Sequence, residues 1–551
     1  MFSKHPKGLV AASLANLGER FGFYTMMAIL VLFLQAKFAL SGTEAGWIYS
    51  TFYFSIYILA LVGGVIADKT RNYKGTILIG IVLMALGYVL LAIPSQTPVV
   101  NKALMLTVTC GALFIIAFGN GLFKGNLQAL VGQMYDDPKY SSLRDSGFSW
   151  FYMFINIGAI FAPPAAVGVR NWWLSHNGFA YNPDLPGLCH GHLAGTLQPQ
   201  AAETYQTLAN EVSGAPVTDL TQFANDYLNV FSTGFHYAFA VAIVAMLVSL
   251  IIYVVNKKRF PDPSKKVADK SAASAATVEM SAQEVKQRIM ALFAVFGVVI
   301  FFWFSFHQNG LTMTFFARDY TTQSVTGLDR IGFDVWNLVL LIIVVYGAFS
   351  LFQSKTGRGK AIAGVAVLAS LGILIWSYSS MDPTVEILPQ IFQQFNPFFV
   401  VALTPVSLAV FGYLARRKKE PSAPRKIGIG MVIAACGFLI LAIGSLGLPT
   451  PKEVEAAGIN PDVLVSPNWL ISTYLVLTFA ELLLSPMGIS FVSKVAPPKY
   501  KGMMMGGWFV ATAIGNYLVA IIGYLWGGIQ LWMVWSVLIV CCLLSALFIF
   551  S

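Results

Sequence analysis

Charged residues are scarce along the whole chain. Asp, Glu, Lys and Arg make up 11% of its 551 residues, whereas soluble domains carry about 25%. Apolar runs of about 18 residues or more recur instead from one end of the chain to the other. These runs are continuous and do not alternate with polar residues, which weighs against a membrane β-barrel. The scarcity of charge therefore excludes a string of soluble domains and predicts an all-α integral membrane protein.

Cysteine is also scarce, and its placement argues against a disulfide framework. Cys189 stands in a polar loop between apolar runs, with no obvious partner, whereas the other four lie in apolar runs, where a thiol packs as a small hydrophobic group. These four are Cys110, Cys436, Cys541 and Cys542. Cys189 begins the sequence Cys-His-Gly-His, but three candidate ligands in one loop are a weak signal for a metal. We interpret the segment as a surface loop and expect neither a metal nor a cofactor.

Motifs of enzyme active sites are missing as well. The sequence contains no glycine-rich phosphate loop, no His/Asp cluster at a membrane face, and no Ser–His–Asp arrangement that spacing can assign. An integral-membrane enzyme is therefore the less favoured class.

The apolar runs predict 14 membrane-spanning helices. Their expected ranges are 8–36, 44–68, 74–93, 101–130, 145–169, 232–256, 286–316, 334–353, 360–379, 388–415, 425–446, 467–494, 502–527 and 529–550. The first run is too long for a signal peptide and has no small-residue cleavage site. We expect it to remain as a helix.

The net charge of +10 follows from the distribution of Lys and Arg between alternate loops. Basic clusters lie on the side of the N-terminus, at 69–74, 257–259, 355–360, 416–419 and 494–501. The opposite loops hold few cations: Lys37, Lys102, Arg170, Arg318, Arg330 and Lys452. This asymmetry predicts a multi-pass protein of the plasma (inner) membrane with both termini cytoplasmic. Nucleic acid is not needed as a partner.

Two polar segments divide the chain. The first forms a long outer loop at 170–234, with a short helix expected at about 200–212, and the second is a cytoplasmic linker at 257–285. We expect an N-terminal six-helix bundle over 1–256 and a C-terminal six-helix bundle over 286–551. The nearly polar-free hairpin at 334–379 is interpreted as an inserted packing or lipid-facing element. Two bundles with a midplane cavity between them are typical of a carrier.

Two charges lie inside the first apolar run. Glu19 and Arg20 would each cost several kcal/mol, about 2.5–3.5 on insertion scales, if they faced lipid. They must therefore face a partner or a watery cavity, and such residues by default mark a substrate or ion pathway.

A short motif closes the second span. Gly63 to Arg71 reads Gly-Gly-Val-Ile-Ala-Asp-Lys-Thr-Arg and resembles the inner-loop signature of the major facilitator superfamily. Small residues permit close helix approach, and Asp68 can cap a helix end during rocking. We expect Asp68 and Arg71 to act in gating.

Further motifs resemble those of proton-coupled oligopeptide transporters. Glu19 to Tyr24 reads Glu-Arg-Phe-Gly-Phe-Tyr, similar to the first-helix motif of that family. The other matching segments follow in order at 121–126, 151–158, 395–397, 481–488 and 508–516. The resemblance implies a major facilitator fold, two six-helix bundles plus the extra hairpin, and secondary active transport of di- and tripeptides or peptide-like solutes.

A short peptide is a zwitterion, so its site needs an anion, a cation and amide-matching groups. Glu481, with the carbonyls of Asn156 and Asn396, suits the ammonium; Lys124, with Arg20, suits the carboxylate. Aromatic residues are expected to line side-chain pockets. The substrate-binding set is Arg20, Tyr24, Tyr57, Lys124, Asn156, Trp303, Asn396, Glu481, Trp508 and Thr512. A purely structural Lys124–Glu481 salt bridge, helix packing by the aromatics and interhelical asparagine hydrogen bonds remain the alternatives.

The sequence departs from the family pattern where ionic chemistry is concerned. Asn16 replaces the first glutamate of the first-helix motif, Met27 an arginine one turn later, and His307 a glutamate of the seventh helix. The hairpin also follows span seven, whereas bacterial relatives usually carry it between spans six and seven.

Proton coupling could still use Glu19, Arg20, His307 and Glu481, because an imidazole titrates near neutral pH and paired charges exchange protons as partners move. His307 is either a titrating gate or a neutral hydrogen-bonding ring.

The partners expected are a small peptide, protons and the lipid bilayer, with the chain acting as a monomer. Alternative functions are a facilitator or symporter of another small solute, such as an amino-acid derivative or anion, and a non-transporting peptide sensor.

Overall fold

The computed structural model confirms a helical membrane protein. It describes residues 4–40, 42–182, 185–261, 280–387, 389–450, 452–453, 464–526 and 528–551. Within these residues 14 helices are long and apolar enough to cross a membrane, which matches the number expected from the apolar runs. The greater part of the predicted linker, residues 262–279, lies outside the described residues.

The α-helices are α1 (Lys7–Phe38), α2 (Gly42–Thr70), α3 (Tyr73–Ala92), α4 (Lys102–Met134), α5 (Arg144–His176), α6 (Leu185–Ala194), α7 (Pro199–Ser213), α8 (Leu220–Asn256), α10 (Ala282–Phe306), α11 (Thr312–Asp319), α12 (Val335–Gln353), α13 (Gly357–Ser380), α14 (Phe395–Arg416), α15 (Ala423–Gly444), α17 (Asn468–Val495), α18 (Lys501–Leu525) and α19 (Leu531–Phe550). Two short strands, β1 (Ser324–Thr326) and β2 (Thr384–Glu386), pair antiparallel.

The chain folds into two compact units that do not follow chain order. Unit 1 comprises Met1–Met134, Phe161–Thr277 and Lys499–Phe509, and unit 2 comprises Tyr135–Ile160, Val278–Pro498 and Val510–Ser551. Two helices, α5 and α18, therefore contribute residues to both units.

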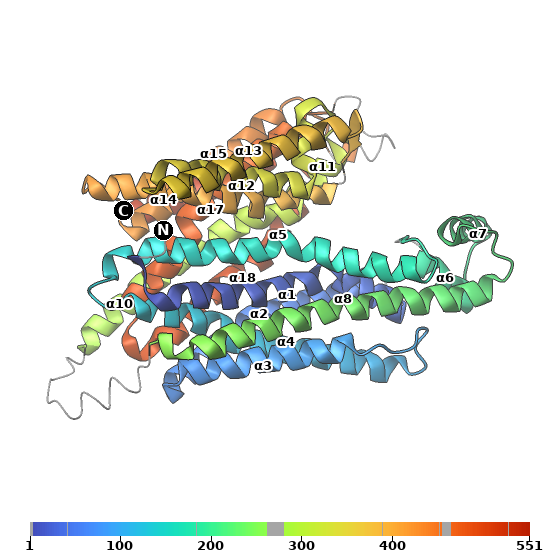
Figure 1. The fold of residues 1–551 in the computed structure, drawn as a ribbon, viewed down its shortest axis with the longest axis horizontal. Helices are drawn as coiled ribbons and strands as arrows, with labels where there is room; N and C mark the ends of the chain where they lie inside the picture. Colours follow the sequence, from blue (N-terminus) through green and yellow to red (C-terminus); the bar gives the residue numbers. More distant parts are fainter. Residues whose placement is uncertain are drawn as a thin grey trace. The chain divides into compact units, whose positions relative to one another are not determined.

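Unit 1 is a bundle in which α3 packs on α4 and α8, α1 on α8, and α2 on α4 (Figure 1). Glycine permits the closest of these approaches. A Cβ on Gly63 of α2 would lie 2.1 Å from the backbone oxygen of Gly121 on α4. Such contacts bring helix backbones together, which is how helices associate where lipid removes the hydrophobic driving force.

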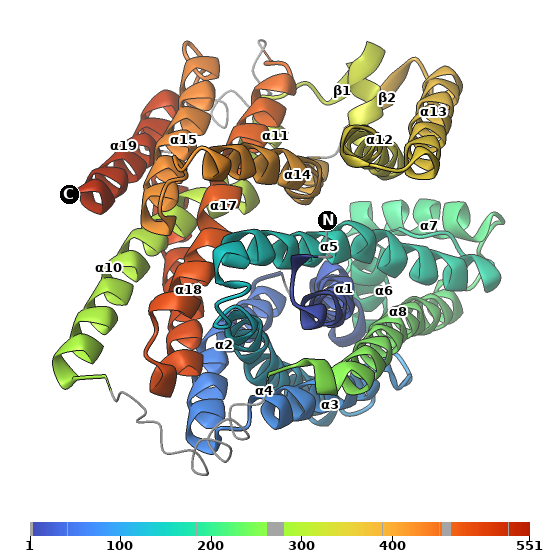
Figure 2. The same cartoon turned by 60° about the vertical axis from the view of Figure 1, so that its left-hand side comes forward.

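In unit 2, α15 packs against α17 and α19, and α14 against α17. The hairpin α12–α13 joins this unit through α12 and α14, and the β1–β2 ribbon lies at one end of the hairpin (Figure 2). Large apolar side chains of α13 are exposed, including Leu368 (72%) and Trp376 (69%). This agrees with a lipid-facing hairpin inserted after span seven.

The outer polar segment is more ordered than the sequence indicates. The short helix expected at 200–212 is present as α7, but α6 was not expected, and α8 begins at Leu220 rather than near 232. The Asp219 carboxylate caps α8 by accepting hydrogen bonds from the backbone N–H groups of Thr221 and Gln222, which starts the helix in polar sequence. The surface-loop interpretation is wrong for Cys189, which is buried within α6.

The seventh span is also interrupted where an unbroken helix was expected over 286–316. Helix α10 ends at Phe306 and continues as a 3-10 turn, His307–Gly310, before α11. The Gln308 side-chain amide donates to the backbone oxygens of Phe304 and Val519. It thereby satisfies carbonyl groups near the break. Helix interruptions in transporters commonly accompany ligand sites.

Candidate functional site

Glu19 and Arg20 form a buried ion pair within α1. The Arg20 guanidinium contacts both Glu19 carboxylate oxygens, Nε–Oε2 and Nη2–Oε1 each at 2.5 Å. Asn120 Nδ2 of α4 donates a third hydrogen bond, 2.7 Å, to Glu19 Oε1. The pair is 0% and 3% exposed, so each charge depends on the other for its stabilisation. Neither faces lipid, as the sequence predicts.

Lys124 lies in an aromatic setting in the same unit. Its ammonium stands 4.8 Å from the ring centroid of Tyr57 and 4.5 Å from that of Phe509. Arg20 lies 5.8 Å from the Tyr24 ring. Within unit 1 the described residues place no carboxylate in an ion pair with Lys124. The Lys124 ammonium is therefore stabilised by cation–π contacts with the two rings and remains able to attract an anion.

Glu481 of α17 is a buried carboxylate held by neutral donors. Asn396 Nδ2 donates to its Oε2 at 2.6 Å, and the Tyr152 hydroxyl donates to its Oε1. Asn396 also donates to the Thr478 hydroxyl at 3.1 Å. No Lys or Arg of unit 2 forms an ion pair with Glu481 in the described part of the chain. The carboxylate is thus positioned in unit 2 without a cation.

The other predicted residues of unit 2 lie on α5, on α10 and the 3-10 turn that follows it, and on α18. Asn156 donates its Nδ2 to the backbone oxygen of Tyr152 on its own helix. Trp303 and His307 stack with ring centroids 4.8 Å apart. Thr512 is buried on α18. Trp508 lies on the same helix as Thr512 but belongs to unit 1, where it is buried.

Asp68 caps the first turn of α18. Its Oδ1 accepts from Gly502 N at 2.9 Å, and its Oδ2 from Met503 N at 2.7 Å. The Tyr73 hydroxyl also donates to Oδ1. A carboxylate at a helix N-terminus satisfies orphan N–H groups and opposes the positive end of the dipole. Arg71, in contrast, is exposed and adopts a positive φ of 53°.

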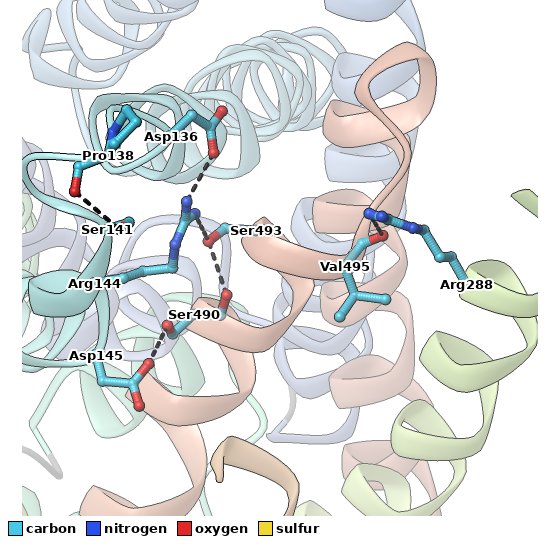
Figure 3. A network of polar contacts seen from close by, with 9 residues as sticks. All are labelled: Asp136, Pro138, Ser141, Arg144, Asp145, Arg288, Ser490, Ser493 and Val495. Atoms are coloured by element: carbon cyan, nitrogen blue, oxygen red, sulfur yellow. Dashed lines mark hydrogen bonds and ion pairs between the residues drawn. The ribbon is translucent and has the colours of Figure 1, made fainter. Parts of the chain in front are cut away.

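A polar network in unit 2 was missed by the sequence interpretation (Figure 3). Arg144 donates to Ser493 Oγ and Asp136 Oδ1, both at 2.7 Å, and Ser490 donates to Asp145 at 2.5 Å. The buried Lys426 ammonium contacts Asp145 as well, at 2.9 Å. The available signal was Lys426 itself, a cation just inside an apolar run.

Glu420 completes the surroundings of Lys426, with its carboxylate 2.6 Å from the ammonium. The network therefore connects α5, α15 and α17 with the segment before α15. Its ion pairs and hydrogen bonds join the first turns of α5 and α15 to the last turns of α17. The pattern of apolar runs does not predict these contacts.

The departures from the expected motif are also visible. Asn16 is buried, and its Nδ2 has no hydrogen-bond partner among the described residues. The His307 side chain lies close to Asn516 of α18. Asn516 lies in the segment 508–516, which resembles a family motif, but it was not among the predicted site residues.

Comparison with known proteins places the chain among transporters. A model of the POT family matches residues 74–282 and 369–527. The peptide transporter YePEPT of Yersinia enterocolitica is 27% identical over 545 residues, covering 95% of this chain and 88% of that protein. Dipeptide and tripeptide permease A of Salmonella typhimurium is 24% identical over 533 residues, with 94% and 83% covered.

Solved structures share the fold. A POT family transporter in complex with 5-aminolevulinic acid has a TM-score of 0.58 at 18% identity, covering 100% of this chain and 96% of that one. A crystal structure of the peptide transporter POT in complex with sulfate has a TM-score of 0.55 at 21% identity, with 100% and 95% covered. Because the family model matches well over half of the residues, this multi-pass membrane protein belongs to the POT family.

Proposed function

We propose that the protein moves di- and tripeptides, or peptide-like solutes, across the plasma (inner) membrane by alternating access, without altering them chemically. The observation that carries this proposal is Glu481, a buried carboxylate that accepts from neutral donors and forms no ion pair with a Lys or Arg among the described residues of unit 2. A buried carboxylate in this setting favours a cationic ligand, such as a peptide ammonium. Relatives named as peptide transporters and dipeptide permeases support the same substrate class.

The peptide carboxylate is assigned to Lys124 and Arg20. Lys124 is held by aromatic faces rather than by an acid of its own unit, so an incoming carboxylate gains a charge-assisted partner. Tyr24, Tyr57, Trp303, Trp508 and Thr512 are proposed to contact the remainder of the substrate, and Asn156 and Asn396 to assist Glu481.

Transport is proposed to be coupled to protons. Glu19, Arg20, His307 and Glu481 are buried or partly buried groups whose partners can exchange during the cycle. His307 takes the place of a carboxylate in the family pattern, and it is the group proposed to add a proton near neutral pH.

The cytoplasmic gate is assigned to Asp68 and Arg71. Asp68 releases two backbone N–H groups of α18 when it moves away, and these must regain partners elsewhere. Arg71 is proposed to help Asp68 from the adjoining turn. Both termini are proposed to be cytoplasmic, which the distribution of basic loops supports, and the protein is proposed to act as a monomer.

The test is uptake of a labelled dipeptide into proteoliposomes, with and without an inward proton gradient. Competing solutes are dipeptides, tripeptides, single amino acids and small anions. Competition by peptides and accumulation driven by protons are expected. If only anions or amino-acid derivatives inhibit uptake, the substrate is one of those solutes and not a peptide. Peptide binding without tracer flux would instead indicate a sensor.

A further inference from the structure

Helix α14 carries a proline, Pro405, in its interior. Because proline has no backbone N–H, the Val401 carbonyl four residues earlier loses its intrahelical hydrogen bond. Inside a membrane no water replaces that bond, and a neighbouring helix has to supply a donor. The Thr404 hydroxyl of the same helix does not serve Val401, since it donates to the Val400 backbone oxygen at 2.6 Å. The freed carbonyl therefore needs a partner from outside α14.

The inserted hairpin supplies that partner. The Tyr346 hydroxyl of α12 donates to the Val401 backbone oxygen at 2.9 Å, and α12 packs against α14 (Figure 2). Close packing within the hairpin supports the tyrosine. A Cβ on Gly347, the next residue, would lie 2.5 Å from Val367 Cγ2 of α13. The two hairpin helices thus approach closely at the point from which the hydroxyl reaches α14.

The same hydroxyl also contacts α5 within unit 2. Its oxygen lies 2.7 Å from Met153 Sδ, and Met153 is buried. A tyrosine hydroxyl has one proton, and a carbonyl oxygen is a stronger acceptor than a thioether sulfur. Tyr346 therefore hydrogen-bonds to α14 and packs on α5 at a single point.

Glu481 takes its two neutral donors from these same two helices. Asn396 of α14 lies five residues before Val401, about 7.5 Å along the helix, and donates to Glu481 Oε2. Tyr152 of α5 directly precedes Met153 in the sequence, and its hydroxyl donates to Glu481 Oε1. The hairpin hydroxyl is consequently in contact with both of the helices that orient the buried carboxylate.

We propose that Tyr346 is a positioning residue of the ammonium site, through which the hairpin α12–α13 sets how well Glu481 binds a peptide amino group. Without the hydroxyl the Val401 carbonyl has no donor, and an unpaired buried carbonyl is costly. Helix α14 then shifts to relieve it and moves Asn396 relative to Glu481. This assignment rests on the proposed peptide transport, and it gives the inserted hairpin a role beyond contact with lipid.

The experiment measures the preference for a free amino terminus. Proteoliposomes containing the full chain take up a labelled dipeptide, and competition gives the affinities of alanyl-alanine, its N-acetyl derivative and its C-terminal amide. Tyr346→Phe keeps the ring and loses the hydroxyl. Its preference for the free amino terminus should fall about fivefold, as expected for one typical hydrogen bond. The preference for a free carboxylate should keep its wild-type value, because Lys124 belongs to unit 1.

Pro405→Ala provides the rescue. Alanine restores the backbone N–H that pairs with Val401, so Tyr346→Phe should leave the amino-terminal preference unchanged in this background. Thermal unfolding in detergent follows the same cycle: Tyr346→Phe should lower the Tm when Pro405 is present but not in the Pro405→Ala background. The matched control is Tyr378→Phe, which removes another hairpin hydroxyl, from a ring beneath Arg330. It should keep both preferences.

An unchanged amino-terminal preference in Tyr346→Phe overturns the inference. A change of equal size with and without Pro405, in the preference or in the Tm, overturns it as well, and so does an equal loss at both ends of the peptide. A wild type that does not distinguish the dipeptide from its N-acetyl derivative overturns the Glu481 assignment and the inference together. Failure of every dipeptide to compete with the wild type overturns the transport proposal, and the inference with it.

Discussion

Asn396 on α14 donates a 2.6 Å hydrogen bond to the Glu481 carboxylate on α17. Two helices that pack against each other thus place a neutral donor on a buried acid. An amide can hold a carboxylate in position without neutralising its charge, whereas a lysine or arginine there would compete with a cationic substrate. The pair therefore supports an ammonium-binding role more directly than burial alone.

Replacing Glu481 with Gln should remove the preference for a free amino terminus. The wild type is expected to bind a dipeptide at least about tenfold more tightly than its N-acetyl derivative, because hydrogen bonds to charged groups contribute about 1.5–3 kcal/mol. In Glu481→Gln the two ligands should bind about equally. Competition for labelled uptake measures this, and Glu386→Gln, on an exposed strand residue, is the control. A preference that survives in Glu481→Gln contradicts the assignment.

Lys124→Met should act at the other end of the substrate. The wild type is expected to bind a dipeptide more tightly than its C-terminal amide, and the variant should bind both with similar, weaker affinity, because methionine keeps the aromatic packing but loses the charge. Competition assays give the two affinities. Lys139→Met changes an exposed lysine beside Tyr140 and should have no effect. Equal loss for both ligands would point to a structural role.

His307→Gln tests proton coupling. Glutamine can hydrogen-bond to Asn516 but cannot gain a proton, so uptake should lose its pH dependence near neutrality and its accumulation under a proton gradient. Counterflow exchange at fixed pH should persist. The measurement compares accumulation with exchange in the same vesicles. Unchanged pH dependence and accumulation would remove His307 from the coupling path.

The Lys426 network should respond non-additively to mutation. Lys426 is 1% exposed between Asp145 and Glu420. Either Asp145→Asn or Glu420→Gln leaves one acid in contact and should cost at most about 1 kcal/mol, because each carboxylate is 32% exposed. The double variant leaves a buried ammonium without a carboxylate and should cost more than the sum, because an uncompensated buried charge costs about 3–5 kcal/mol. Thermal unfolding in detergent measures the cycle; simple additivity would show that Lys426 finds another partner.

The outer segment should loosen in acid. His190 of α6 hydrogen-bonds through Nε2 to the Ala36 backbone oxygen at 2.7 Å. Burial lowers the pKa of His190, and this outweighs the opposing hydrogen bond to Ala36. The ordinary value of about 6.5 applies when the segment opens. The open form therefore gains a proton first, and the stability contributed by neutral His190, complete above about pH 6.5, falls as pH drops below that value.

Cys189 reports this opening. It is buried beside His190, and burial raises its pKa to about 12, so it remains a protonated thiol. In a chain with the other cysteines replaced, labelling of Cys189 should accelerate from pH 7 to pH 5 relative to His190→Gln at each pH. The comparison cancels the intrinsic pH dependence of the reagent. Parallel rates in both proteins would exclude His190 as the cause.

The sequence by itself determined the membrane class and the number of spans. A run such as α13 is apolar on all sides because lipid requires it, so no knowledge of neighbours is needed. The Glu19–Arg20 pair was likewise predictable, since two charges in an apolar run must find partners. Ordered motifs then indicated the family.

Tertiary structure alone decided which polar atoms meet. Lys426 reads only as a cation at the start of an apolar run until folding places the Asp145 carboxylate beside its ammonium, and Asn516 gains meaning only beside His307. These residues are far apart in the sequence, and a hydrogen bond extends about 3 Å. Span prediction is uncertain by about 2–4 residues, which exceeds that reach along a helix. The physical reason is therefore one of range: hydrophobicity acts over whole segments, whereas recognition depends on single atoms.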